Sequence, residues 1–132
     1  MGGWMQPQGL PFDLSYSLRL GHVQVLLNML AFGHSPQVAL DAPRIAISPH
    51  DTTRPDGVVH LEHGIPPHTI SGLKKLGHNV EVESGIGRGG YFGRGQIIRA
   101  RKRNVEEEGG EGWVYSAGSD MRGDGAALAF NG

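Results

Sequence analysis

The first clear pattern in the chain is an apolar stretch near its beginning. Residues 22–32 read His-Val-Gln-Val-Leu-Leu-Asn-Met-Leu-Ala-Phe, and only three of them are polar. Gly33 follows where a left-handed helix C-cap is usual, so the stretch predicts a helix. A helix that is apolar on nearly all sides needs other elements packed around it. We expect this helix to be buried in the complete fold, and we expect the rest of the chain to supply too few elements to cover it.

The following residues predict a short helix and then two strands. Ser35 and Pro36 form a typical N-cap and N1 pair, so a helix should run to about Asp41. The β-branched content of residues 44–48 and 58–62 predicts short strands. A polar turn separates them, so a hairpin or a looped pair is expected.

The second half of the chain alternates strand and helix. Pro66 and Pro67 open a helix with its apolar side chains on one face, and residues 80–83 alternate Val and Glu as in a half-buried strand. Residues 96–101 and 113–117 predict two more strands, joined by an acidic turn. The pattern therefore predicts a single mixed α/β (α+β) domain without internal repeats.

Composition excludes several classes of function. Only 38% of the residues are apolar and 22 of 132 are glycine, so a large self-sufficient core is not expected. The formal net charge of -1 gives no overall attraction to nucleic acid or to an anionic membrane. The absence of cysteine excludes disulfides and thiolate sites, and no apolar run approaches the ~18 residues of a membrane span. We expect no membrane segment in this chain and no cofactor.

A glycine-rich segment fits the spacing of a dinucleotide-binding fingerprint. Gly85-Ile-Gly-Arg-Gly-Gly90 matches G-x-G-x-x-G and follows an expected strand. The fingerprint works by opening a helix whose N-terminus receives the pyrophosphate, whereas this segment leads toward another strand. We interpret it as a glycine-rich loop between strands.

Basic residues gather between Arg88 and Arg103, next to Tyr91 and Phe92. Arginine together with aromatic side chains is typical of proteins that bind single-stranded RNA. Glutamates follow at once and would oppose a phosphate backbone. A solvated hairpin face is the preferred interpretation and no nucleic acid is expected, with RNA binding through Arg88–Arg103 as the alternative.

Histidines raise the question of a metal site. His60 and His63 lie three residues apart, with His68 beyond them and Glu62 between. These residues would have to converge across a strand end and a turn, and no cysteine is present, so the spacing is weak support for zinc. We expect surface histidines and no metal.

Small and charged residues alternate in the block 117–127. Small residues permit close approach of the backbone, and Asp120, Arg122 and Asp124 could form a hydrogen-bonded ion cluster at the end of a strand. A catalytic role for Asp120 or Asp124 is the alternative, although no paired titratable partner is identifiable.

Two adjacent glycines, Gly2 and Gly3, open the printed sequence. Adjacent glycines allow consecutive N–H groups to point at a ligand, as in an oxyanion hole. Such donors stabilise charge created by a nucleophile on another segment, and no segment precedes them here. We expect an oxyanion site without its nucleophile.

Taken in order, several of these segments resemble the gamma-glutamyltransferase (gamma-glutamyltranspeptidase) family. The resemblance rests on Gly2-Gly3 and on residues 24–30, 35–44, 61–66, 77–82 and 118–125. Its most specific pieces are Asp41-Ala-Pro-Arg44 and Gly118-Ser-Asp-Met-Arg122. The order is close to collinear over nearly the whole chain.

The resemblance implies an N-terminal-nucleophile hydrolase with a four-layer α/β/β/α sandwich. Members are made as one precursor that cleaves itself into a large and a small subunit, and a new N-terminal threonine is the nucleophile that forms a glutamyl-enzyme. The chain then corresponds to the C-terminal portion of the small subunit, as a single partial domain over residues 1–132. Its substrate in the intact enzyme would be a glutathione-like gamma-glutamyl amide, and no cofactor is implied.

By the same resemblance, Gly2 and Gly3 match the oxyanion hole. The nucleophilic threonine and the residues that hold the glutamyl group would precede Met1, and Thr52, Thr53 and Thr69 are internal. The large subunit and the missing part of the small subunit are therefore the expected partners, and the chain is expected to be inactive alone. A non-catalytic role as a partner of another chain is the alternative.

Residues 10–21 interrupt the resemblance. In the family, the Pro-Gln-Gly that ends at Gly9 would continue almost directly into His22. The twelve intervening residues are expected to be an insertion. A retained intron or a gene-model error is the preferred explanation, and a true loop insertion is the alternative.

Overall fold

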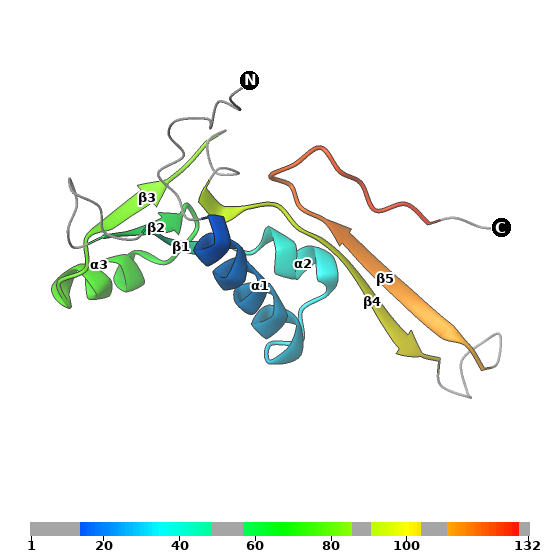
Figure 1. Ribbon diagram of the computed structural model, residues 1–132. Helices are drawn as coiled ribbons and strands as arrows, with labels where there is room; N and C mark the ends of the chain where they lie inside the picture. The colour runs from blue at the N-terminus through cyan, green and yellow to red at the C-terminus, as the bar shows by residue number, and fades with distance from the viewer. Residues whose placement is uncertain (1–13, 49–56, 86–90, 104–110, 130–132) are drawn as a thin grey trace, which may run out of the picture.

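The structure is a computed structural model that describes residues 14–48, 57–85, 91–103 and 111–129 (Figure 1). These residues form three helices and five strands in a mixed α/β arrangement, as the sequence predicts. In chain order, the elements are α1 (Leu14–Leu30), α2 (Pro36–Asp41), β1 (Ile45–Ser48), β2 (Val58–Glu62), α3 (Pro67–Lys75), β3 (Val80–Glu83), β4 (Gln96–Lys102) and β5 (Trp113–Ser119).

Two separate sheets organise the strands. The first has the order β1-β2-β3, in which β2 pairs antiparallel with β1 and parallel with β3. Helix α3 connects β2 to β3, which is the crossover that a parallel pair requires. The second sheet is the hairpin of β4 and β5. The predicted looped pair, the strand-helix-strand unit and the late hairpin are all confirmed.

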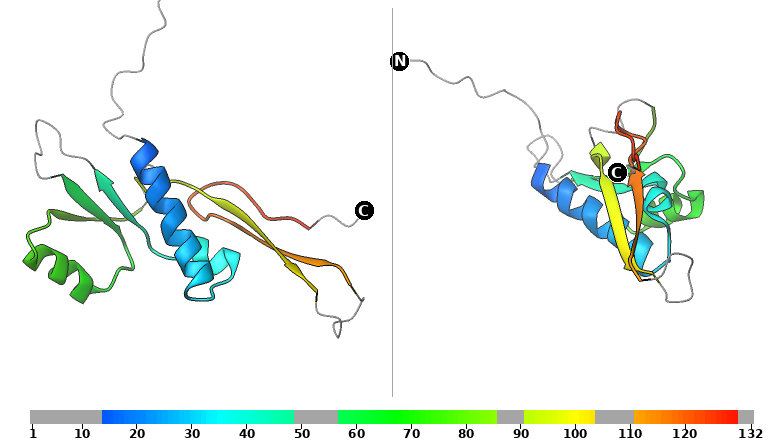
Figure 2. Two further views of the ribbon diagram at one scale, coloured as in Figure 1. Left: turned by 60° about the horizontal axis from the view of Figure 1, so that its bottom comes forward. Right: turned by 90° about the vertical axis from the view of Figure 1, so that its right-hand side faces the viewer.

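Helices α1 and α2 lie between the two sheets (Figures 1 and 2). Helix α1 contacts β1 and α2, and α2 contacts both strands of the hairpin. The main apolar cluster lies at this junction, and Ile97 of β4 packs against it. Its buried members are Val25, Met29, Ala39 and Leu40.

Helix α1 begins earlier than the sequence pattern predicts. It starts at Leu14 rather than at His22, so residues 14–21, which the sequence analysis assigns to an insertion, are helical and continue without a break into the predicted helix. The end agrees with the prediction, because Gly33 adopts a φ of 69° and the His34 N–H donates to the Asn28 carbonyl at 3.0 Å. Among the described residues, no helix is long and apolar enough to cross a membrane.

Helix α2 docks onto the hairpin through a glycine and a glutamine. The Ser35 side chain caps the helix by accepting from the Val38 N–H, as predicted. The Gln37 side chain donates to the Ser119 carbonyl at 2.9 Å and accepts from the Ser119 N–H at 3.0 Å. A Cβ atom at Gly118 would lie 2.7 Å from the Gln37 nitrogen, so only glycine permits this approach.

Candidate functional site

Four charged side chains from distant parts of the chain meet in the interior. We name Arg44, Glu62, Asp120 and Arg122 the charged network. Arg44 lies between α2 and β1, Glu62 ends β2, and the other two follow β5 directly. All four side chains are at most 5% exposed. Burying a charge costs free energy unless the charge is paired, so each of these side chains needs a partner of opposite charge.

Ion pairs and hydrogen bonds join the four side chains in a line. Arg44 Nη2 lies 2.6 Å from Asp120 Oδ2, and Arg122 Nη1 lies 2.9 Å from Asp120 Oδ1. Arg122 also binds Glu62 in a bidentate manner, through Nε at 2.8 Å and through a second short bond from Nη2. Glu62 in turn accepts the Arg44 backbone N–H at 3.0 Å. Bidentate charge-assisted bonds of this kind fix geometry as well as charge.

Other donors of the two arginines bind backbone carbonyls, although Arg44 Nε is buried without a hydrogen-bond partner among the described residues. Both guanidinium groups donate to the Leu40 carbonyl, Arg44 at 3.0 Å and Arg122 at 2.8 Å, and Arg122 donates also to Ala42 at 3.2 Å. These carbonyls lie at the end of α2, where no helical partner exists for them. The network therefore also caps α2.

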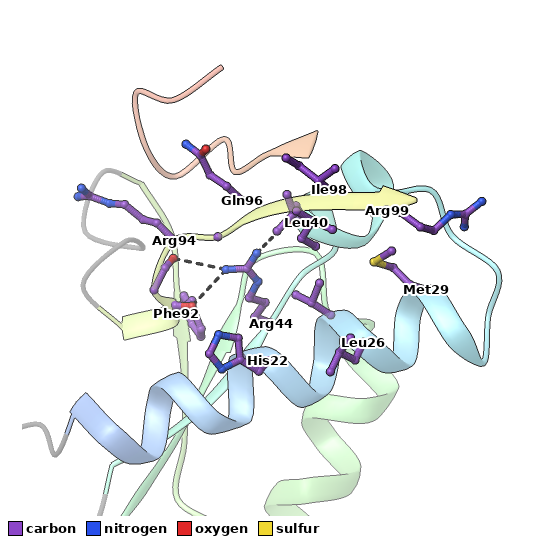
Figure 3. Close-up of a pocket in the computed structure, with 15 residues that line it drawn as sticks. His22, Leu26, Met29, Leu40, Arg44, Phe92, Arg94, Gln96, Ile98 and Arg99 are labelled. Atoms are coloured by element: carbon purple, nitrogen blue, oxygen red, sulfur yellow. Dashed lines mark hydrogen bonds between the residues drawn. The ribbon is translucent and has the colours of Figure 1, made fainter. Parts of the chain in front are cut away.

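Arg44 connects α2 to the start of the hairpin as well. Its Nη1 donates to the carbonyls of Phe92 and Gly93, at 3.2 and 3.4 Å (Figure 3). Asp120 makes a parallel connection, because its Oδ2 accepts from the Gly95 N–H at 3.0 Å and its own N–H donates to the Gly95 carbonyl. The segment before β4 is thus held from two sides.

The electrostatics of the network favour permanent charges. Burial alone would raise the pKa of Asp120, but hydrogen bonds from the backbone and side chain of Arg122, together with Arg44, outweigh it and leave the pKa below its ordinary value. Burial likewise opposes the charge of Arg122, and Glu62 and Asp120 reverse this and raise its pKa. A carboxylate that stays ionised and saturated is unsuited to proton transfer near neutral pH. The geometry supports a structural role for Asp120.

Half of this network was predicted from the sequence. Asp120 and Arg122 form the predicted ion cluster after a strand, whereas Asp124 is exposed and forms no ion pair with the described residues of the network. Arg44 and Glu62 were not assigned to it, although Arg44 ends the specific Asp-Ala-Pro-Arg segment. A charged residue at the end of a buried strand, as Glu62 is, was the available signal for the missing partner.

Helix α1 presents the opposite environment. Val23, Leu26 and Leu27 are each about half exposed, Leu30 is 79% exposed and Phe32, just beyond the helix, is 69% exposed. We name these five residues the open face. The sequence pattern predicts that this helix lacks cover, and this face of it does within the described part of the chain. Contiguous exposed apolar side chains of this kind mark interaction surfaces.

A cavity of about 440 Å³ lies between α1 and β4 (Figure 3). Val25, Leu26 and Met29 line it from the helix, and Ile97 and Ile98 line it from the strand. Its walls are mainly apolar, and the open face continues from its edge through Leu26. The gap between helix and hairpin is therefore an apolar recess rather than a polar reaction centre.

The histidine predictions are corrected in one position. His60 is buried at 3% exposure, not at the surface, because it lies in the central strand of the first sheet. Its ring contacts Ser48 and Glu83 rather than the other histidines. His63 and His68 are exposed, as expected, and Glu62 belongs to the charged network.

The structure describes only parts of the glycine-rich segment and of the basic segment. Gly85 has a φ of 79° and the chain enters β4 at Gln96, as expected of a loop between strands, while residues 86–90 lie outside the described residues. Arg88 is outside them too. The basic residues of β4, including Arg99, are exposed, so the expected solvated hairpin face is confirmed for them.

The predicted oxyanion glycines, Gly2 and Gly3, lie outside the described residues, and so do Thr52 and Thr53. Thr69 is part of α3. The assignment of Gly2 and Gly3 therefore stays a prediction.

Comparison with known proteins identifies the kind of chain to which this structure belongs. The family model described as Gamma-glutamyltranspeptidase matches residues 17–130. No curated protein matches the chain. Among solved structures, it is similar to cephalosporin acylase from Bacillus halodurans, with 34% identity and a TM-score of 0.61 over 85% of this chain and 18% of that one.

Two gamma-glutamyltranspeptidase structures share the fold at lower identity. The enzyme from Pseudomonas nitroreducens, complexed with L-DON, is 21% identical with a TM-score of 0.56, over 84% of this chain and 49% of that one. An acivicin-inhibited gamma-glutamyltranspeptidase, whose C-terminus has critical roles in autoprocessing and catalysis, is 20% identical with a TM-score of 0.58 over 80% and 48%. The chain thus spans about half or less of each solved chain. It is a mixed α/β fragment, and it belongs to the gamma-glutamyltranspeptidase family.

Proposed function

We propose that the chain is the C-terminal part of the small subunit of an enzyme that transfers or hydrolyses gamma-glutamyl groups through a threonine acyl-enzyme. The observation that carries this proposal is the family match over residues 17–130, on a chain that spans 48% and 49% of two solved gamma-glutamyltranspeptidase chains. The substrate in the intact enzyme is a glutathione-like gamma-glutamyl amide, and the reaction needs no cofactor.

The parent fold under this proposal is the four-layer α/β/β/α sandwich of N-terminal-nucleophile hydrolases. The open face and the apolar recess support it, because an intact layered fold would cover them. The remaining part of the small subunit and the large subunit would supply that cover. Burying such a surface stabilises a fold by roughly 25 cal/mol for each Å² of apolar area removed from water.

The charged network has a supporting role in this enzyme. It ties the residues after β5 to α2, to β2 and to the segment before β4. The acivicin-inhibited relative has a C-terminus with critical roles in autoprocessing and catalysis. A rigid connection from the late residues to the rest of the fold fits such a role, since catalytic groups need neighbours that fix their positions.

The chain alone is inactive under the proposal. Gly2 and Gly3 would supply the oxyanion hole, but Thr52, Thr53 and Thr69 are internal and have no free amine to serve as a base. Oxyanion donors without a nucleophile and without the groups that hold the substrate give little rate enhancement.

A chromogenic assay tests both parts of the proposal. We expect the purified chain to release no chromophore from a gamma-glutamyl anilide, and a longer precursor that continues upstream of Met1 to release it. The precursor also provides the control for folding. Robust turnover by the 132-residue chain would refute the inactivity, and a folded, processed precursor without turnover would refute the gamma-glutamyl reaction.

A related amide hydrolase is the second candidate. The 34% identity to cephalosporin acylase exceeds the 20% and 21% identities to the two gamma-glutamyltranspeptidases described above. By its name, that relative acts on an acyl group of cephalosporins rather than on a gamma-glutamyl group. Comparing the precursor on a cephalosporin and on a gamma-glutamyl anilide separates the two, and the substrate with the larger kcat/KM identifies the activity.

A further inference from the structure

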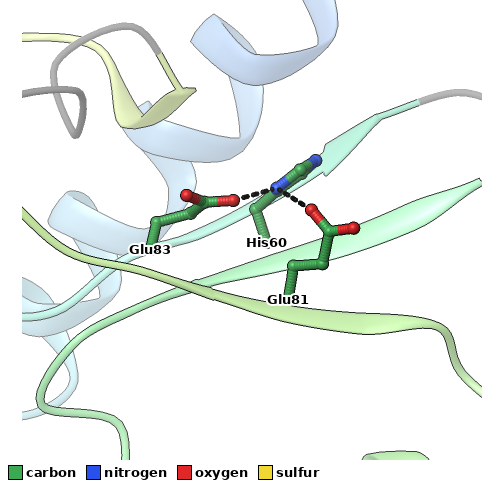
Figure 4. Close-up of side chains that lie close together, drawn as sticks. All are labelled: His60, Glu81 and Glu83. Atoms are coloured by element: carbon green, nitrogen blue, oxygen red, sulfur yellow. Dashed lines mark hydrogen bonds and ion pairs between the residues drawn. The ribbon is translucent and has the colours of Figure 1, made fainter.

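A histidine and two glutamates meet on one face of the first sheet, next to the Glu62 end of the charged network (Figure 4). His60 lies on β2, and Glu81 and Glu83 lie on β3. The parallel register places His60 directly opposite Glu81. Alternate residues of a strand share a face, so Glu83 projects on the same side as Glu81.

The potential ligand atoms lie near one another, close to the spacing in a metal site. His60 Nδ1 lies 2.8 Å from Glu83 Oε1 and 3.9 Å from Glu81 Oε2, and the potential ligand atoms of all three residues lie within 4.8 Å of one another. Ligands at the usual ~2.0–2.1 Å from a tetrahedral zinc ion are about 3.3 Å apart. The observed distances lie on both sides of that value, so small side-chain rotations would complete the geometry.

The imidazole is held in an orientation typical of a metal ligand. Its Nε2 lies 2.7 Å from Ser48 Oγ, and its ring stacks on Tyr91 with a centroid distance of 4.4 Å. With a metal on Nδ1, the Nε2–H group donates to the Ser48 hydroxyl. A partner of this kind on the second ring nitrogen fixes the tautomer and the ring plane of metal-binding histidines.

Charge and exposure agree with a cation that enters from solvent. Carboxylate oxygens are negatively charged ligands that divalent transition metal ions bind readily. His60 is buried, whereas the Glu81 side chain is 41% exposed and the Glu83 side chain is 23% exposed. The carboxylate side therefore offers an entry path and room for water ligands.

We propose that His60, Glu81 and Glu83 bind a divalent transition metal ion, with Zn²⁺ as the best match. One imidazole nitrogen and two carboxylate oxygens form a donor set suited to Zn²⁺ and less suited to Ca²⁺ or Mg²⁺, which prefer oxygen ligands throughout. The ion joins β2 to β3 and does not depend on the proposed enzymatic reaction.

Calorimetric titration of the full chain with Zn²⁺ alone tests the site. We expect one ion per chain and a rise in the urea midpoint on binding. Glu81→Gln removes one charged ligand at a position that is 41% exposed, and it should weaken binding by at least about tenfold. His63→Ala removes a nearby exposed histidine outside the cluster and should leave the affinity unchanged.

A second readout separates this site from surface binding. Co²⁺ in place of Zn²⁺ should give visible absorption bands in the original chain and in the His63→Ala variant, and these bands should be lost or altered in Glu81→Gln. No binding at 100-fold excess over the chain, or equal weakening in the His63→Ala and Glu81→Gln variants, overturns the proposal.

Discussion

The charged network and the open face of α1 lie in the same fold and differ in almost every physical respect. The network consists of charged side chains that are at most 5% exposed and bonded to one another. The open face consists of apolar side chains that are all more than half exposed. The buried charges of the network are paired within the described residues, whereas the open face is not covered by them.

This difference separates what the chain can stabilise by itself from what it leaves to other segments. Buried charges must find their partners locally, because an unpaired one costs several kcal/mol, on the order of 3–5. Apolar side chains in contact with water leave no charge unpaired. The fold can therefore leave them exposed until another segment covers them. The contrast supports a fragment in which the charged network is paired within the chain and the open face of α1 is left uncovered.

Removing Arg122 should have the largest effect on stability, because it disrupts the charged network and leaves the open face unchanged. Arg122→Ala leaves Glu62 and Asp120 without their shared cation in the interior. We expect a loss of about 3–5 kcal/mol in the free energy of unfolding, or failure to fold, measured by urea denaturation. Arg99→Ala, at an exposed position of β4, is the matched control and should change stability by at most about 0.5 kcal/mol. Equal effects of the two variants would show that the network contributes no special stability.

Adjacent residues of α1 test where the helix is covered. Met29 is 9% exposed and belongs to the apolar cluster, whereas Leu30 is 79% exposed. Met29→Ala should cost about 2 kcal/mol or more, and Leu30→Ala should cost about 0.5 kcal/mol or less in the isolated chain. In the longer precursor, the cost of Leu30→Ala should rise if the open face is covered there. A constant small cost in both proteins would mean that Leu30 faces water in each.

The contact between α2 and β5 gives a smaller effect. Gly118→Ala places a Cβ atom against the backbone of Gln37 and should push the helix from the strand, at a cost of about 1–3 kcal/mol. Gly72→Ala, in open space within α3, should instead stabilise the chain by about 0.5–1 kcal/mol through helix propensity. Thermal melts of the two variants should shift in opposite directions. Shifts of the same sign would contradict the close approach at Gly118.

The pH dependence of stability is the mildest test. Because the pKa of Asp120 is lowered in the folded state, the folded state binds this proton less readily than the unfolded state. The stabilisation is therefore fully present above the unfolded pKa of about 3.9 and is lost as the pH falls through the lower folded pKa. Urea midpoints of the original chain and of Asp120→Asn should differ most at neutral pH and converge at acidic pH. A difference that stays constant down to low pH would contradict this role of the ionised carboxylate.

Local patterns were sufficient to predict most of the elements. Ser35 caps α2 as its residue type predicts, and the alternation of Val and Glu in residues 80–83 marks β3. The start of α1 was not predicted. Residues 14–21 were interpreted as part of an insertion, and no helix was predicted for them. In the structure they form the first part of α1.

The contacts that were not predicted join residues far apart in the sequence. Arg44 and Asp120 are separated by 76 positions, and Glu62 and Arg122 by 60. No local pattern connects residues so far apart, whereas Asp120 and Arg122 are two apart and were recognised together. His60 shows the same limit, because its carboxylate partners lie on β3, beyond the intervening helix α3.

Amide hydrogen exchange of the 132-residue chain tests the contrast between the two regions most directly. We expect the amides of α1 around the open face to exchange at least about tenfold faster than the amides of Arg44 and Asp120, which donate to the charged network and to the segment it holds. Attaching the upstream part of the precursor should slow exchange in α1 and change it little at Arg44 and Asp120. Equal protection of both regions in the isolated chain would contradict the account, because the helix would then need no further cover.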